Sequence, residues 1–305
     1  MRTTALAIAV ILLISPGIAQ SLPEQLPQAV YTDPATDPAH PTSTIAIEIP
    51  SHGSIMDGLV YRPAGQGPYP LVILLHGLPG NEQNMDLAQA LRRAGWAVMT
   101  FNYRGNFGSE GQFSIDHVIE DTKIAVAYSA TPAIAKAWDI DPERIVVIGH
   151  SMGGLAAALS AGSGPKREAT ILLAPWDPSR LQTLLRPLSL SDRNAAGWDR
   201  WGDVTHGRLT GTSSPQIAAQ IVDHGERWTL ADAASGLANE PILIVTAKRD
   251  SPVNKAETLR AALKRDGAKF DAVEIDSDHG FQDRRIKLET VVISWLSQFV
   301  TERGR

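Results

Sequence analysis

The sequence predicts an α/β domain with a mostly parallel central sheet and helices on both faces. Short continuous apolar runs alternate with longer helical patterns over most of the chain. Runs in which every side chain is apolar suit strands that are buried on both faces, as in parallel sheets. With 305 residues, 43% of them hydrophobic and 20% charged, the chain is long enough for one large core with an insertion.

The elements follow in order along the chain. Residues 43–50 and 58–62 predict a strand pair at an antiparallel edge, because a turn over 51–54 separates two β-rich runs. The remaining predicted strands are 71–75, 97–101, 145–148, 170–173, 242–246 and 270–275. The predicted helices are 83–94, 118–137, 151–161, 255–266 and 284–299. Gly95 and Gly267 directly follow two of these helices and predict their ends.

One stretch interrupts this alternation. Residues 176–240 contain no clear strand, and a segment of this length is too long for a simple loop. Four of the seven tryptophans of the chain lie in it: Trp176, Trp198, Trp201 and Trp228. We therefore expect a helical cap insertion over the carboxyl edge of the sheet, with residues 44–175 and 241–305 forming the core.

The N-terminus predicts export. An apolar run over 5–14 follows a basic residue, and small residues precede a cleavage site after Ala19. We expect residues 1–19 to be a signal peptide and the protein to be secreted or periplasmic, with no stable membrane span after signal cleavage. An uncleaved anchor is the weaker alternative, because about 20 apolar residues are needed to span a bilayer. Residues 20–43 contain five prolines, which favours an extended leader.

The strongest motif is Gly149-His150-Ser151-Met152-Gly153, which lies between a β-branched run and an Ala/Leu-rich helical run. A strand that turns directly into a helix leaves no room for β-carbons, so glycine fits on both sides of the serine. This context is that of a nucleophile elbow, and a chance pentapeptide is the alternative. We expect Ser151 to stand exposed at the carboxyl edge of the sheet.

A serine hydroxyl needs a base that takes its proton and a carboxylate that orients that base. His279 follows the last predicted strand and Asp250 the strand before it, so both are expected at the same sheet edge. Asp250 is free for this role because Asn254 is better placed to cap the next helix, and Asp177 is the reserve carboxylate. A solvated or helix-capping role is the alternative for His279. Two other nearby carboxylates are expected to be solvated turn residues: Asp276 and Asp278.

The oxyanion that forms during acyl transfer needs two backbone N–H groups that already point at it. Met152 supplies one from the start of its helix. The second is expected from the glycine-bounded turn over 76–80, after strand 71–75. Because Pro79 has no N–H, Leu78 is the favoured donor, and a plain glycine turn is the alternative.

Charge and histidine spacing limit the partners. The net charge is −5 and the basic residues are scattered, so nucleic acid is not an expected partner. The histidines show no ligand spacing, so no metal site is expected. No cofactor is implied either, because acyl transfer through three side chains needs none. His76 and His150 are expected to brace loops.

These motifs resemble the serine α/β-hydrolase superfamily over residues 44–300. The matching residues are His76-Gly77, Tyr103-Arg104-Gly105 with Ser109 and Gly111, Gly149 to Gly154, Asp250, and Asp278-His279-Gly280-Phe281. The resemblance implies an α/β-hydrolase fold with Ser151 as nucleophile, His279 as base and Asp250 as its acid partner. It also implies an oxyanion hole at Leu78 and Met152.

For Arg104, the resemblance implies a structural role in bracing its loop, and binding of a substrate carboxylate is the alternative. The chain is similar to bacterial esterases and to the catalytic domains of prolyl-oligopeptidase-like peptidases. We expect a carboxylesterase-like serine hydrolase that acts on a small-molecule ester or acyl substrate. A serine exopeptidase or amidase and a non-catalytic binding protein are the alternatives. Trp176 is the first choice for a substrate-binding residue in an aromatic acyl pocket.

Overall fold

The computed structural model describes residues 26–188 and 207–301. The predicted signal peptide, the first part of the predicted leader, and Trp198 and Trp201 lie outside the described residues. Within the described ranges, no helix has the length and apolar character needed to cross a membrane.

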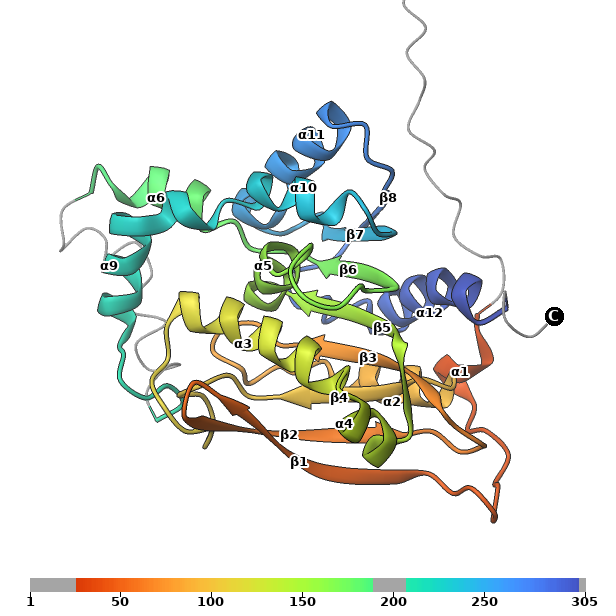
Figure 1. Cartoon of the computed structure of the whole chain (residues 1–305). Helices are drawn as coiled ribbons and strands as arrows, with labels where there is room; N and C mark the ends of the chain where they lie inside the picture. The colour runs from red at the N-terminus through yellow and green to blue at the C-terminus, as the bar shows by residue number, and fades with distance from the viewer. Residues whose placement is uncertain (1–25, 189–206, 302–305) are drawn as a thin grey trace, which may run out of the picture.

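One eight-stranded sheet runs through the described part of the chain, in the order β1-β2-β4-β3-β5-β6-β7-β8 (Figure 1). The strands are β1 (Ser43–Ser51), β2 (Ser54–Arg62), β3 (Tyr69–Leu75), β4 (Ala97–Phe101), β5 (Ile140–His150), β6 (Ala169–Leu173), β7 (Ile242–Ala247) and β8 (Asp271–Ile275). β2 is antiparallel to both of its neighbours, and the other neighbouring strands from β4 to β8 are parallel. The predicted mostly parallel sheet with an antiparallel edge is therefore confirmed.

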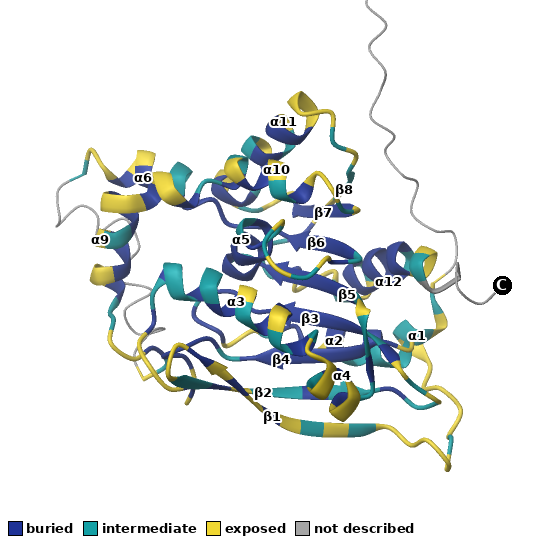
Figure 2. Ribbon diagram, in the orientation of Figure 1, coloured by how far each residue is buried: buried dark blue, intermediate teal, exposed yellow. Residues whose placement is uncertain are grey.

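Helices cover both faces of the sheet, as predicted. One face carries α2 (Met85–Arg93) and α12 (Arg285–Thr301); the other carries α3 (Ile115–Ser129), α4 (Pro132–Trp138), α5 (Met152–Leu159) and α11 (Glu257–Arg265). Successive side chains of β3 alternate between the two cores. Leu71, Ile73 and Leu75 belong to one core, and Val72 and Leu74 to the other. Burial on both faces explains why the central strands have continuous apolar sequences (Figure 2).

The helix predicted over 118–137 is two helices, so that prediction is wrong as a single element. α3 ends at Ser129, and α4 begins at Pro132, which occupies its first turn. A proline lacks the N–H needed inside a helix, and its ring clashes with the preceding turn. Pro132 therefore starts a new helix and cannot continue α3.

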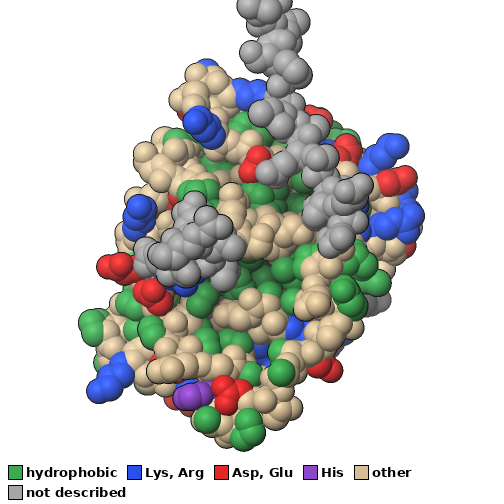
Figure 3. Space-filling model, turned by 90° about the vertical axis from the view of Figure 1, so that its right-hand side faces the viewer, with side chains coloured by type: hydrophobic (Ala, Val, Ile, Leu, Met, Phe, Trp, Pro, Cys, Tyr) green, Lys and Arg blue, Asp and Glu red, His purple; other side chains and the backbone are tan. Residues whose placement is uncertain are grey.

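Part of the predicted leader is folded onto the core. A short helix, α1 (Gln28–Tyr31), packs against α2 and α12. Nε of Arg93 donates to the carbonyl of Ala29 at 2.6 Å. Figure 3 shows the side of the molecule on which α1 lies, with hydrophobic side chains across its middle and charged ones mainly toward its edges. Residues 28–31 of the leader are thus helical and packed, whereas the sequence predicted an extended leader.

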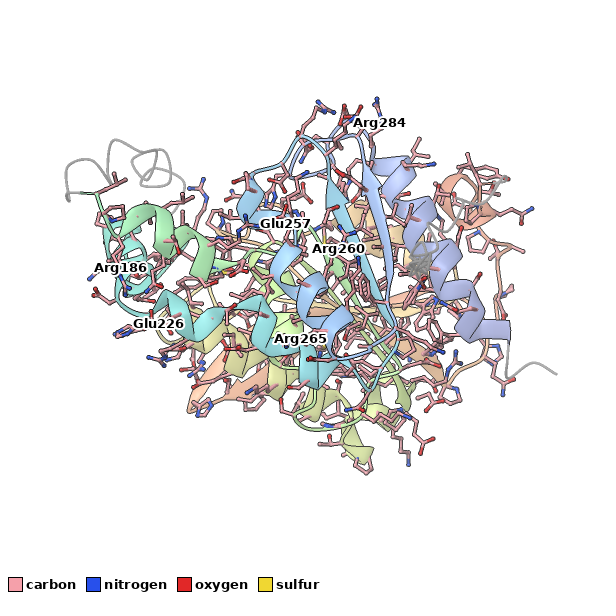
Figure 4. The ribbon with its side chains drawn as sticks, turned by 90° about the horizontal axis from the view of Figure 1, so that it is seen from above. Arg186, Glu226, Glu257, Arg260, Arg265 and Arg284 are labelled. Atoms are coloured by element: carbon pink, nitrogen blue, oxygen red, sulfur yellow. The ribbon has the colours of Figure 1, made fainter. Side chains whose placement is uncertain are left out.

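The segment between β6 and β7 has two parts. α6 (Pro178–Leu185), α9 (Ser214–His224) and η2 (Gly225–Trp228) form an outer part beyond the carboxyl ends of the strands (Figure 1). η3 (Leu230–Ala233) and α10 (Ala234–Leu237) instead pack on α5 and α11 in the helical layer. Figure 4, seen from above, labels residues of both regions: Arg186 and Glu226 on the outer part, and Glu257, Arg260 and Arg265 on α11.

The contacts that hold this outer part include a buried hydrogen bond to the core and an exposed ion pair. Nε1 of Trp228 donates to a carboxylate oxygen of Asp116, on α3, at 2.8 Å, and Trp228 is buried. Within the outer part, Arg186 and Glu226 form an exposed ion pair at 3.8 Å. The buried tryptophan contact is the stronger anchor, because exposed ion pairs contribute little to stability.

Candidate active site

The nucleophile elbow has the backbone that its sequence predicts. β5 ends at His150, α5 begins at Met152, and Ser151 between them has φ 56° and ψ −117°. A β-carbon at position 149 would overlap the backbone of Gly153, where α5 begins. Positive φ is costly for a serine, and such strain is found where a site requires it. Gly149 therefore permits the tight turn that presents Ser151, and Gly153 permits the close approach of α5 to the carbonyls of Leu75 and His76.

Three side chains from distant parts of the chain meet beside this elbow. Nε2 of His279 lies 2.9 Å from Oγ of Ser151. Nδ1 of the same imidazole lies 2.6 Å from Oδ2 of Asp250. The Asp250 side chain is 3% exposed and that of His279 is 38% exposed, so the imidazole lies between a buried carboxylate and the open side of the site. In this geometry Asp250 fixes the tautomer that leaves Nε2 free to accept a proton from Ser151.

Hydrogen bonds keep the Asp250 carboxylate ionised. Burial acts to raise its pKa, but the hydrogen bond and charge of His279, the amide of Asn254 and the N–H of Ser251 together hold that pKa below its usual value. Nδ2 of Asn254 donates to Oδ1 at 2.9 Å, and the N–H of Ser251 donates to the same oxygen at 2.6 Å. The carboxylate is therefore charged at neutral pH.

The prediction that Asn254 caps the following helix is wrong. The residue before α11 is Ala256, whose φ is 52°, and no side chain caps this helix. Asn254 instead ends a short 3₁₀ helix, η4 (Pro252–Asn254), which turns its amide back toward Asp250. Sequence reasoning missed this role because a polar residue shortly before a helix is more often its cap.

The reserve carboxylate, Asp177, is engaged elsewhere. It caps α6 by accepting the N–H of Ser179 at 3.2 Å, and its second oxygen accepts the hydroxyl of Thr258 at 2.6 Å. The residue is only 1% exposed. These bonds tie α6 to α11, so Asp177 stabilises the attachment of the outer part.

The two aspartates close to His279 in sequence also have other partners. Asp276 is exposed and pairs with Arg249 at 3.2 Å. Asp278 accepts the backbone N–H of Gln282 at 2.8 Å. Asp278 thus acts within the turn that precedes α12, and Asp276 pairs with a residue of the loop after β7.

The side chains of His150 and Arg285 hold the loop that carries His279 by donating to two of its backbone carbonyls. Nε2–H of His150 donates to the carbonyl of His279 at 3.0 Å. Nη1 of Arg285 donates to the carbonyl of Gly280 at 2.9 Å. Burial lowers the pKa of His150 to about 4, so its imidazole is neutral near pH 7 and can keep this tautomer. The residue before the nucleophile thereby supports the loop of the expected base.

The loop after β3 passes directly against the elbow. A β-carbon on Gly77 would lie 3.0 Å from Cβ of Ser151, so glycine permits this close approach. Leu78 follows and is half-buried. On the other side, Met152 is the first residue of α5, and the first N–H groups of a helix have no partner within it. The two segments expected to supply oxyanion donors thus flank Ser151.

Sequence reasoning missed Asn106, which braces the loop after β3. Its Nδ2 donates to the carbonyl of Pro79 at 2.7 Å and lies 3.3 Å from the carbonyl of Arg208. Asn106 is fully buried and also forms a bridge with Leu209. It therefore joins this loop to the segment between β6 and β7.

His76 and Arg104 also have bracing contacts. Nδ1–H of His76 donates to the carbonyl of Gly77 at 2.8 Å, and burial lowers the pKa of His76 to about 4. The buried Arg104 guanidinium bonds to Asp121 at 2.6 Å and to Glu120 at 2.7 Å. With two carboxylates already bound, Arg104 is positioned to hold its loop, which favours the structural role over binding of a substrate carboxylate.

Trp176 lies next to the elbow. Its backbone N–H donates to the carbonyl of Ser151 at 3.0 Å, and the residue is 8% exposed.

No group of three or more histidine, aspartate or glutamate side chains is placed to hold a metal ion in the described ranges.

Comparisons with known proteins identify the family of this chain. A sequence model of the alpha/beta hydrolase family matches residues 72–287. The quorum-quenching protein AidA of Acinetobacter baumannii is 31% identical over 143 residues, which is 45% of this chain and 45% of that protein. The chain spans about half the length of the curated relatives that it matches, 45% and 60% in two cases.

Solved structures share the fold. The 2,6-dihydroxy-pseudo-oxynicotine hydrolase superposes with a TM-score of 0.61 at 23% identity, covering 85% of this chain and 68% of that one. The esterase of Pyrobaculum calidifontis superposes with a TM-score of 0.60 at 21% identity, covering 86% of this chain and 88% of that one. The family match extends from β3 to the start of α12 and so includes the elbow, Asp250 and His279. The chain belongs to the alpha/beta hydrolase family.

Proposed function

We propose that this protein is a serine hydrolase that cleaves carboxylic esters through an acyl-enzyme intermediate. Ser151 is the nucleophile, His279 the general base and acid, and Asp250 the group that orients His279. The observation that carries the proposal is the continuous set of contacts from Ser151 Oγ through both imidazole nitrogens to Asp250. The binding of small-molecule esters or acyl compounds is part of the same proposal.

The geometry supports a two-step reaction. Nε2 of His279 accepts the hydroxyl proton as Oγ of Ser151 attacks the carbonyl carbon, and the imidazolium is stabilised by Asp250. The oxyanion is held by the N–H groups of Leu78 and Met152. His279 then gives its proton to the leaving alcohol as the C–O bond breaks. A water molecule attacks the acyl-enzyme with the same base, and the acid and free Ser151 are released.

Esters are favoured as substrates by the name of a structural neighbour. The Pyrobaculum calidifontis protein is named an esterase. In this chain, Trp176 begins the segment between β6 and β7, and its backbone N–H donates to the carbonyl of Ser151. We assign Trp176 to the acyl side of the substrate site, where a large aromatic side chain would contact the acyl chain.

The test uses the purified protein and its Ser151→Ala variant. We expect wild type to hydrolyse p-nitrophenyl esters of graded chain length and to be labelled by a fluorophosphonate probe. Ser151→Ala should lower kcat by about 10³-fold or more, because the nucleophile is lost. Full activity in Ser151→Ala would refute the mechanism.

Two further outcomes would favour other functions. Faster cleavage of aminoacyl anilides than of matched esters would indicate an exopeptidase. A folded wild-type protein that is neither labelled nor active would indicate a binding protein with a hydrolase fold.

We also propose that the protein is exported and cleaved after Ala19. The support is the sequence itself, in which an apolar run of signal-peptide length precedes small residues. The mass of the N-terminal peptide of protein recovered from the cell envelope or medium tests this cleavage, and a peptide that retains residues 1–19 would contradict it.

A further inference from the structure

One polar side chain beside the site contacts both Asp250 and His279. Asn254 ends η4 and is 8% exposed. Its Nδ2 lies 2.9 Å from Oδ1 of Asp250 and 3.3 Å from Nδ1 of His279. No other amide side chain has a hydrogen bond to either group in the described part of the chain.

The contacts divide the two oxygens of Asp250 between different donors. Oδ2 accepts from His279, and Oδ1 accepts from the amide of Asn254 and the N–H of Ser251. The N–H of Ser251 belongs to the adjacent residue and shares the loop of Asp250. Asn254 is therefore the side-chain donor to Oδ1, and it comes from η4.

The orientation of the amide follows from its partner. If the amide were turned by half a rotation, its oxygen would face the carboxylate oxygen of Asp250, and two acceptors would repel. With Nδ2 on Asp250, Oδ1 of Asn254 is buried and has no hydrogen-bond partner among the described residues. A buried polar atom without a partner costs stability, and a leucine of similar size would avoid that cost.

We propose that Asn254 is a positioning residue that fixes the Asp250 carboxylate, so that Oδ2 stays on His279 Nδ1 and Nε2 stays directed at Ser151. This inference rests on the proposed function of the three side chains. Asn254 does not touch the reacting atoms, and it acts through Asp250. Oδ1 of Asn254 stays unpaired because the amide is turned so that Nδ2 donates to Asp250.

The test compares Asn254→Leu and Asn254→Asp with wild type. Both replacements keep the branched shape of asparagine. Leucine cannot donate to Oδ1 of Asp250, and aspartate places a second carboxyl group against it. With p-nitrophenyl esters we expect kcat to fall about 10- to 100-fold, the scale of one hydrogen bond to an ionised group. KM should stay within about twofold, because substrate contacts are unchanged.

The matched control is Thr258→Val. Thr258 lies four residues after Asn254, and its hydroxyl donates to another carboxylate, that of Asp177. The near-isosteric change to valine removes this hydrogen bond. It should lower stability at least as much as Asn254→Leu does, because it leaves a buried carboxylate oxygen of Asp177 without its hydroxyl donor, while kcat stays within about twofold of wild type. Urea unfolding of each variant measures the stability change. If Thr258→Val lowers kcat as much as Asn254→Leu does, the effect reflects loop stability and the proposal is overturned.

A spectroscopic measurement separates this inference from the proposed function. The proton between His279 and Asp250 should give a far-downfield proton NMR resonance, whose position depends on the geometry of that hydrogen bond. Asn254→Leu and Asn254→Asp should shift or broaden it, and Thr258→Val should leave it in place. These NMR changes would support the positioning role even if wild type hydrolyses no ester. Absence of ester hydrolysis would count against the proposed function alone. Folded Asn254 variants with an unchanged resonance and kcat within about twofold of wild type would overturn the positioning role.

Discussion

Replacement of Asp121 by asparagine tests the buried ion pair beneath the loop that follows β4. The Asp121 carboxylate is fully buried and accepts three hydrogen bonds. The donors are Oγ of Ser51 at 2.7 Å, the N–H of Arg104 at 2.9 Å and Nε of Arg104 at 2.6 Å. An amide of the same shape offers one acceptor oxygen, so at least one buried donor loses its partner and the Arg104 guanidinium loses its buried counter-charge.

The magnitude follows from these contacts. Breaking a buried ion pair while leaving the other charge in place costs about 3 to 5 kcal/mol of unfolding free energy. With an m-value of about 3 kcal/mol/M for a chain of this size, the urea midpoint of Asp121→Asn should fall by about 1 to 1.7 M. Circular dichroism and tryptophan fluorescence followed through the same urea titration measure this shift.

The control is Glu120→Gln, which removes the other carboxylate on Arg104. Its side chain is 46% exposed, so we expect a loss of at most about 1 kcal/mol. If the midpoint of Asp121→Asn falls no further than that of Glu120→Gln at the same m-value, the reasoning about buried charge is refuted.

Three further predictions concern pH and the site. The pKa values of folded His76 and His150 are about 4 against 6.5 in the unfolded chain, so the unfolded state binds more protons between these values and the unfolding free energy should rise with pH there. Each histidine contributes up to about 3 kcal/mol to this change in the unfolding free energy. Urea titrations from pH 4 to 7 should show the rise, and it should be less steep in His150→Gln. An unfolding free energy that does not change with pH would contradict the prediction. Gly77→Ala should keep a native circular dichroism spectrum but lower kcat/KM at least about tenfold by crowding Ser151, and wild-type kinetics would count against the close approach. Trp176→Ala should change the preference among esters of graded acyl length, and an unchanged preference would remove Trp176 from the acyl site.

Sequence patterns predicted the fold well where local signals and tertiary requirements agree. The continuous apolar runs that became β3 to β7 predicted buried strands because each such strand packs on both faces. The helix break at Pro132 was missed, although a proline in a helical pattern is itself a boundary signal. The apolar periodicity continued across it and favoured one long helix.

For the candidate site, the order of Ser151, Asp250 and His279 along the chain was enough to predict which side chains meet. In a parallel sheet, residues that directly follow strands are brought to one edge, whatever their separation in sequence. The hydrogen bonds of Asn254 and Asn106 could not be predicted from the order of residues along the chain. Each depends on the course of a short turn that directs an amide toward a group on another element.

The sequence by itself determined the sheet and the glycines of the elbow, because these depend on periodicity and on backbone sterics near each residue. The order of strands and loops along the chain predicted that Ser151, Asp250 and His279 meet. Tertiary structure decided the partners of the side chains that support the site, of which the sequence had indicated only that His150 braces a loop. Asn254 orients Asp250 and His150 holds the carbonyl of His279 because folded segments meet there, and hydrogen bonds between distant segments leave no periodic trace in a single sequence.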